Sequence, residues 1–113
     1  MIKIENNGRS KRATGTSLIE CIDIDYSTLV EVLGEPMIGP DTDEYKVDAE
    51  WHIALFDEAE EYDGFVTVYN YKTGKHYNGP EGPSNESITD WHIGGRSRRD
   101  SDLLKEYIDS CAL

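Results

Sequence analysis

The stretch that decides the fold runs from residue 46 to residue 56 and reads Lys-Val-Asp-Ala-Glu-Trp-His-Ile-Ala-Leu-Phe. Apolar side chains occupy every second position, at Val47, Ala49, Trp51, Ile53 and Leu55. Because successive side chains of a strand point to opposite faces, this alternation predicts a β-strand with one face in the core and the other toward water.

Three further segments are typical of strands. The run 65–71 is rich in β-branched and aromatic residues and follows an acidic turn at 57–64, so it is expected to form an antiparallel hairpin with 46–56. Residues 14–24 predict an earlier strand in which Leu18, Ile22 and Ile24 share one face. Residues 88–93 predict a last strand that the Gly94-Gly95 pair ends.

Two segments have helical patterns. Residues 25–28 offer N-caps for a short helix that Gly34 and Pro36 end. From Ser101 onward, apolar residues recur at helical spacing, at Leu103, Leu104, Tyr107, Ile108 and Cys111. The expected fold is α+β, a single domain over 1–113 in which an antiparallel sheet of four to five strands carries two short helices. Residues 1–12 are expected to form a basic arm or a first strand, and 94–113 a Gly-Gly-Arg loop with the C-terminal helix.

Length and composition narrow the function classes. The chain of 113 residues has no apolar run near the roughly 20 residues that a membrane helix needs, and 1–7 lacks the apolar segment of a signal peptide. We therefore expect the protein to stay in the compartment where it is made. Cys21 and Cys111 are expected to be buried thiols. The histidines and cysteines show no metal-ligand spacing and no nucleophile motif is found, so no metal, cofactor or catalytic residue is expected.

The charge is unevenly distributed. The formal net charge is −12, and residues 13–71 contain fifteen acids against one base, Lys46. Basic residues gather near the two ends, at 3–12 and 72–105. Such a field disfavours nucleic acid and anionic membranes as partners. The acidic block is either a solvated surface or a binding surface for a basic protein.

The sequence Gly94-Gly95-Arg96-Ser97-Arg98-Arg99 places three arginines before the C-terminal helix. Glycines allow close approach of the backbone, a helix start offers free N–H groups, and arginine matches phosphate oxygens with a planar fork. These features predict an anion site. The alternative is that the arginines pair with nearby carboxylates of the chain, such as Asp90, Asp100 and Asp102.

A second candidate region is rich in aromatic and amide side chains. Tyr69, Tyr71 and Asn78 lie in or beside the long loop 72–86, where aromatic faces can stack on a base and an amide can read its edge. Ordinary packing across a sheet is the alternative, above all for Tyr69. Lys11 and Arg12, with Arg9, form another basic site or a solvated arm.

Five segments together resemble a known family. They are Asn6-Asn7-Gly8 through Thr14-Gly15-Thr16-Ser17, Val32-Leu33-Gly34-Glu35-Pro36, 45–51, 68–72 and 90–97. The chain resembles small bacteriophage proteins, the phage anti-Thoeris sponges that form the first type of Thoeris anti-defence protein.

The resemblance implies a homodimeric or larger non-enzymatic protein in the cytoplasm of an infected bacterium. It would sequester a cyclic nucleotide immune signal, such as a cyclic ADP-ribose isomer, without cleaving it. Tyr71 or Tyr69 would supply the aromatic, Asn78 the amide, and Arg96, Arg98 or Arg99 the phosphate clamps. The alternative function is an acidic phage inhibitor, of the DNA-mimic or anti-CRISPR type, that binds a host nuclease directly. A phosphodiesterase-like enzyme is a third possibility.

Overall fold

The computed structural model describes residues 2–38, 48–57, 63–70 and 78–111. Six strands occur in the described chain: β1 (Ile2–Asn6), β2 (Ser17–Asp23), β3 (Met37–Ile38), β4 (Ala49–Asp57), β5 (Asp63–Tyr69) and β6 (Asp90–Gly95). The helices are α1 (Tyr26–Leu33) and α3 (Arg98–Cys111), with short 3-10 turns η1 (Lys11–Ala13) and η3 (Asn85–Ser87). The predicted α+β class is confirmed, and the two-residue strand β3 brings the sheet to six strands.

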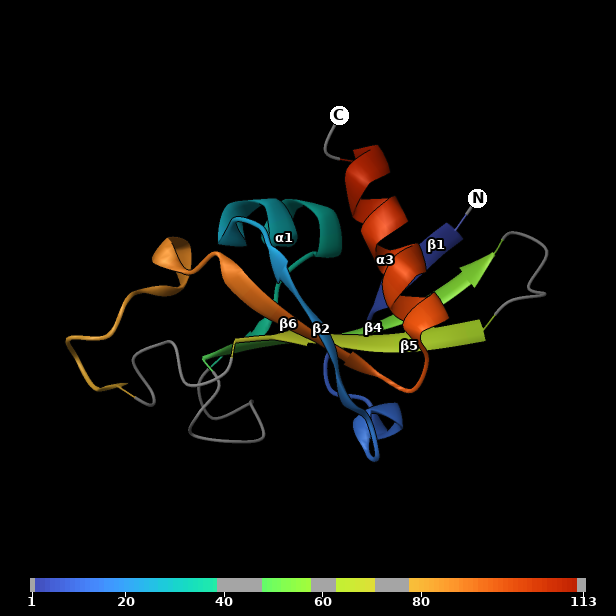
Figure 1. The fold of residues 1–113 in the computed structure, drawn as a ribbon, viewed down its shortest axis with the longest axis horizontal. Helices are drawn as coiled ribbons and strands as arrows, with labels where there is room; N and C mark the ends of the chain where they lie inside the picture. Colours follow the sequence, from blue (N-terminus) through green and yellow to red (C-terminus); the bar gives the residue numbers. More distant parts are fainter. Residues whose placement is uncertain (1, 39–47, 58–62, 71–77, 112–113) are drawn as a thin grey trace.

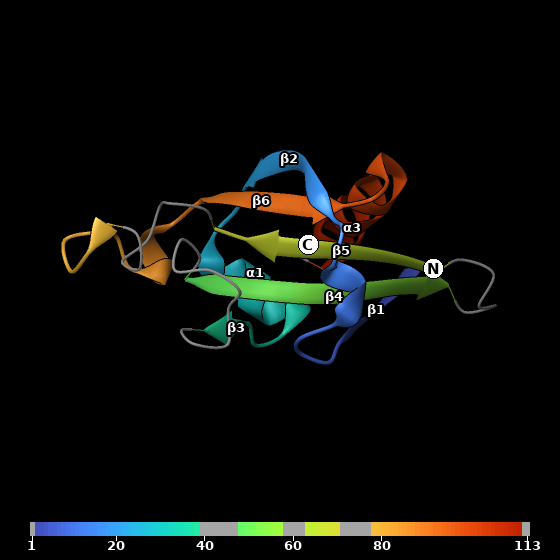
Figure 2. The same ribbon diagram turned by 90° about the horizontal axis from the view of Figure 1, so that it is seen from below.

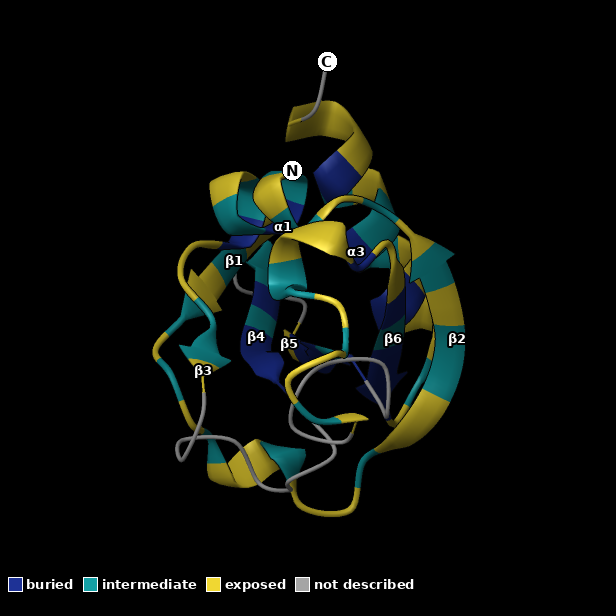
Figure 3. Ribbon diagram, turned by 90° about the vertical axis from the view of Figure 1, so that its left-hand side faces the viewer, coloured by how far each residue is buried: buried dark blue, intermediate teal, exposed yellow. Residues whose placement is uncertain are grey.

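The six strands form a single sheet in the order β1-β4-β5-β6-β2, with β3 also paired to β4. Every neighbouring pair is antiparallel. The alternating segment 46–56 corresponds to β4, which pairs with β1 and β3 on one side and with β5 on the other. Strand β2 is an edge of the sheet, and its residues are intermediate or exposed (Figure 3).

Both helices cover the same face of the sheet, here called the helix face (Figure 1). This face holds an aromatic cluster, in which the Trp51 ring lies 5.5 Å from Trp91 and 6.0 Å from Tyr26 between ring centroids. Trp51 also donates its indole N–H to the carbonyl of Gly34 at 2.8 Å, where α1 ends. Leu104 and Ile108 of α3 join the same core. The helix face is thus closed by apolar packing.

One predicted feature of β2 is wrong. Leu18, Ile22 and Ile24 do not all share a face, because the register shifts between Leu18 and Glu20. The extra residue, Ile19, is a β-bulge that turns Leu18 to the side opposite the helices, where it is 54% exposed. A bulge leaves no period-two trace in the sequence, so the pattern could not reveal it.

The glycine pair also differs from its prediction. The strand does not stop before Gly94 and Gly95, because they are its last two residues, and both are buried. A Cβ on Gly94 would lie 2.6 Å from Oγ1 of Thr67 and 3.3 Å from the Tyr69 ring. These glycines therefore make room for neighbouring side chains rather than for a ligand.

No helix in the described ranges has both the length and the apolar character that a membrane span requires.

Candidate functional site

The side of the sheet opposite the helices, here called the open face, has a different composition. The strand register places Glu50, Tyr69, His92 and Cys21 in one row across β4, β5, β6 and β2. A second row joins His52, Thr67, Gly94 and Leu18. Polar and aromatic groups thus gather on the face opposite α1 and α3.

This face of β4 was predicted to be wet, and that prediction is wrong. His52 is 2% exposed and Glu50 is 8% exposed. The chain that leads from β1 through η1 crosses this face and covers His52 (Figure 2). Ser10 holds this segment in place, because its backbone N–H donates to Nδ1 of His52 at 2.9 Å and its hydroxyl accepts from the backbone N–H of Arg12.

The bond from Ser10 fixes the protonation of the imidazole. Because Nδ1 of His52 accepts a hydrogen bond, the ring proton must be on Nε2. That nitrogen lies 2.9 Å from Oε2 of Glu50, to which it donates. The other oxygen, Oε1 of Glu50, is buried and has no partner within the described ranges. Ser10, His52 and Glu50 form a polar relay under the η1 segment.

Next to this relay, the structure has a cavity of about 230 Å³. It is lined by Arg9, Ser10, Lys11, Ala13, Thr14 and His52. Its volume is below the roughly 300–1,000 Å³ of sites that enclose a drug-sized ligand. A phosphate or a sugar fits within it, while the rest of a larger ligand would extend over the open face. Its basic rim favours an anion.

The arginine loop contacts one of the residues that line this cavity, although Arg96 itself is not one of them. The guanidinium of Arg96 donates through Nη2 to the carbonyl oxygen of Thr14, which is one of the lining residues. The fold therefore brings parts of the two basic regions, 3–12 and 72–105, close together, although the acidic block 13–71 separates them in the sequence. A guanidinium carries five N–H donors, so a bond to one carbonyl does not exhaust its capacity for an anion. Lys11, which lines the cavity, and Arg96, which contacts Thr14 beside it, are here called the cationic pair.

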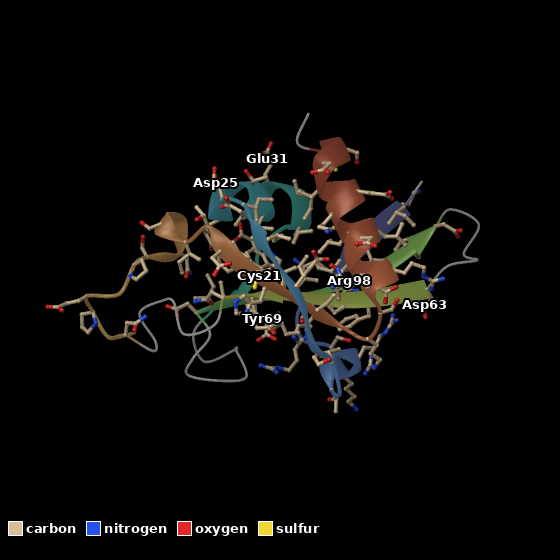
Figure 4. All side chains as sticks on the ribbon, in the orientation of Figure 1. Cys21, Asp25, Glu31, Asp63, Tyr69 and Arg98 are labelled. Atoms are coloured by element: carbon tan, nitrogen blue, oxygen red, sulfur yellow. The ribbon has the colours of Figure 1, made fainter. Side chains whose placement is uncertain are left out.

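Arg98 pairs with a carboxylate of the chain itself, as the alternative for the arginine loop predicted, although with a different partner, and Arg12 of the N-terminal segment also pairs with a carboxylate. Arg12 lies 3.1 Å from Asp63 and stacks over the Phe65 ring. Arg98 lies 3.6 Å from Glu20. Figure 4 shows Arg98 and Asp63 toward the same end of the sheet.

The start of α3 does not offer the free N–H groups expected there. Ser97 caps the helix, because its hydroxyl oxygen accepts from the N–H of Arg99 and its carbonyl accepts from the N–H groups of Asp100 and Ser101. The carboxylate of Asp100 occupies the first turn and accepts from the N–H of Phe65 at 3.2 Å. The chain's own groups thus use the site that an anion would need. Arg99 is exposed in this first turn.

The aromatic and amide residues separate. Tyr69 lies on the open face, with its ring 5.4 Å from that of His92 in an edge arrangement. The segment 78–84, which contains Asn78, extends beyond the end of the sheet, away from η1, in Figures 1 and 2. Tyr71 lies outside the described residues.

Sequence reasoning missed two groupings. The first is the relay of Ser10, His52 and Glu50, whose only trace is a histidine and an acid two residues apart on a strand. The second is a cluster of Cys21, Asp90 and His92. The cysteines were expected to be buried, and that prediction is wrong, because Cys21 and Cys111 are both exposed. Cys21 is exposed since it lies on the open face of an edge strand.

Comparison of the chain with family models, curated proteins and solved structures finds no match. The functional argument therefore rests on the site itself.

Proposed function

We propose that this protein binds an anionic small nucleotide and holds it without chemical change, acting as a sponge for a cyclic nucleotide immune signal. The signal class is a cyclic ADP-ribose isomer or a related cyclic oligonucleotide. The proposed setting is the cytoplasm of a phage-infected bacterium, and the proposed assembly is a homodimer or a larger homo-oligomer.

The observation that carries the proposal is the contact of Arg96 with Thr14, a residue that lines the cavity beside 9–14. A protein with a net charge of −12 repels anions at long range, so two cationic segments joined at one cavity favour a specific anion site. The cavity suits a phosphate, and Tyr69 on the same face offers a ring for a base.

The distribution of acids favours this proposal over the nuclease inhibitor. A DNA mimic needs carboxylates in strings at phosphate-like spacing on one exposed face. Among the described residues the acids of 13–71 are dispersed instead. Asp25 and Glu31 lie at α1, Asp63 lies at the far end of the sheet (Figure 4), and Glu50 is buried.

Calorimetry against cyclic ADP-ribose isomers and cyclic dinucleotides tests the proposal. We expect saturable binding to at least one of them, with intact ligand recovered after heat denaturation. Recovery of a cleaved product would contradict the sponge and favour a phosphodiesterase. Absence of binding to every ligand would contradict a nucleotide site.

Two variants test the cationic pair. We expect Lys11→Ala and Arg96→Ala each to weaken binding about tenfold to hundredfold, since each removes a charge-assisted hydrogen bond worth roughly 1.5–3 kcal/mol. Lys105→Ala is the matched control, because it removes the same charge from the helix side, where Lys105 pairs with Glu20. An equal loss of affinity in all three variants would mean that the net charge of the protein, rather than a specific site, determines binding.

A further inference from the structure

The open face carries a second grouping at the edge between β2 and β6. In the register of these strands Cys21 lies directly opposite His92, and Asp23 lies directly opposite Asp90. The four residues therefore form two facing pairs, each with spacing i, i+2 along its strand. Residues so placed point to the same side of the sheet, so all four side chains leave the surface together.

Three of these side chains come within reach of a common ion. One ligand atom each from Cys21, Asp90 and His92, a sulfur, a carboxylate oxygen and a ring nitrogen, all lie within 4.8 Å of one another. A tetrahedral zinc ion with bonds of about 2.0–2.3 Å holds its ligand atoms roughly 3.4 Å apart. The difference is at most about 1.4 Å, which rotation of exposed side chains on a fixed backbone can supply. Cys21 and Asp90 are exposed, so such rotation meets little resistance.

We propose that Cys21, Asp90 and His92 form a binding site for a transition-metal ion of the zinc class. The mixed set of sulfur, nitrogen and oxygen donors favours Zn²⁺ or Co²⁺ over Mg²⁺ and Ca²⁺, which prefer oxygen ligands alone. Three protein ligands leave a fourth position for water or for an anionic ligand. The proposal is independent of nucleotide binding.

Two neighbouring features support the site. Asp23 and Asp90 face each other directly, an arrangement of like charges that is unfavourable on a sheet and that a bound cation would offset. The ring of Tyr69 packs against that of His92 in an edge arrangement with an interplanar angle of 78°. This contact and the pairing of β6 with β5 both restrict the position of the imidazole. Cys21 and Tyr69, both labelled in Figure 4, lie on either side of His92 in the strand register.

Titration of the reduced full-length protein with Co²⁺, in the absence of nucleotide, tests the site. We expect one ion per chain, a near-ultraviolet charge-transfer band from the thiolate, and displacement of that band by Zn²⁺. Cys21→Ser should abolish the band. His92→Ala and Asp90→Asn should each weaken affinity by at least roughly tenfold, a loss typical of damage to a metal site. Excess Zn²⁺ should also raise the thermal midpoint of the parent protein but not that of Cys21→Ser.

Cys111→Ser is the matched control, because Cys111 is the other exposed cysteine and lies at the end of α3. It should leave the band and the stoichiometry unchanged. Loss of the band in Cys111→Ser, its survival in Cys21→Ser, one ion per two chains, or no binding of either metal would each overturn the proposal. Far-ultraviolet circular dichroism of each variant separates loss of the ligand from loss of the fold.

Discussion

The two faces of β4 are both buried, but by different means. On the helix face, Trp51, Ile53 and Leu55 pack against the core that α1 and α3 cover. On the open face, Glu50 and His52 are buried under the segment that carries Ser10, and hydrogen bonds replace apolar contacts. The apolar packing of the helix face leaves little room for charged groups, whereas the polar open face, covered at His52 by one short segment, can present donors and charges. The comparison explains why both candidate sites lie on the open face.

The largest expected effect comes from breaking the helix face. Trp51→Ala should lower the free energy of unfolding by about 3–5 kcal/mol, because it removes a fully buried indole from the aromatic cluster and leaves a cavity. Urea denaturation followed by circular dichroism measures the loss. Trp51→Phe keeps most of the buried area and should lose much less. A small effect of Trp51→Ala would mean that the helices contribute little to the core.

The contact between Thr67 and Gly94, within the second row of the open face, should give the next largest effect. Gly94→Ala should cost about 1–3 kcal/mol, since its Cβ would overlap Oγ1 of Thr67 at 2.6 Å. Chemical denaturation of Gly94→Ala, Thr67→Ala and the double variant measures the coupling. If the clash is the cause, Thr67→Ala should recover part of the loss. Additive effects would place the strain elsewhere, for example at Tyr69.

A smaller effect is expected from the ion pair that ties the edge strand β2 to α3. The Glu20 carboxylate accepts from the Ser101 hydroxyl at 2.5 Å and from Nζ of Lys105 at 2.9 Å. The hydrogen bond from Ser101 contributes most to holding the pKa of Glu20 below its ordinary 4.5, and the bond from Lys105 also lowers it. A carboxyl whose pKa is lower in the folded state stabilises the fold above its unfolded pKa, and this contribution is lost as pH falls through the folded pKa.

Glu20→Gln should therefore lower the free energy of unfolding by about 1 kcal/mol at neutral pH. The difference from the parent protein should shrink as the pH falls below 4.5, the ordinary pKa of the group. Denaturation midpoints measured from pH 7 to pH 3 check this trend. A difference that does not change with pH would show that packing, rather than charge, accounts for the loss.

The smallest effect is expected at Leu18, the residue that the bulge turns out of the core. Leu18→Ser should change the free energy of unfolding by no more than about 0.5 kcal/mol, because the side chain is 54% exposed. Thermal denaturation measures it. Ile22→Ser is the matched change on the same strand, and it should cost more because Ile22 packs against the core. Equal losses of stability would mean that the bulge at Ile19 does not place Leu18 and Ile22 on opposite faces of the sheet.

The sequence by itself determined the fold class, the order of the main elements and the helix-face core. Periodicity records these because a strand or helix must bury one side, and the period of that side appears directly in residues such as Trp51, Ile53 and Leu55. Single-residue irregularities leave no such record, which is why the bulge at Ile19 and the buried role of Gly94 were not predicted.

Only the tertiary structure decided which polar groups meet. Arg96 contacts Thr14, Ser10 contacts His52, and Cys21 faces His92, in each case across tens of residues and between separate elements. Spacing along the chain carries no trace of such pairs, because the sheet register and the path of the η1 segment create them. The arginine loop was therefore recognisable as a candidate from the sequence, while its division into Arg96 at the cavity and Arg98 in an ion pair was not.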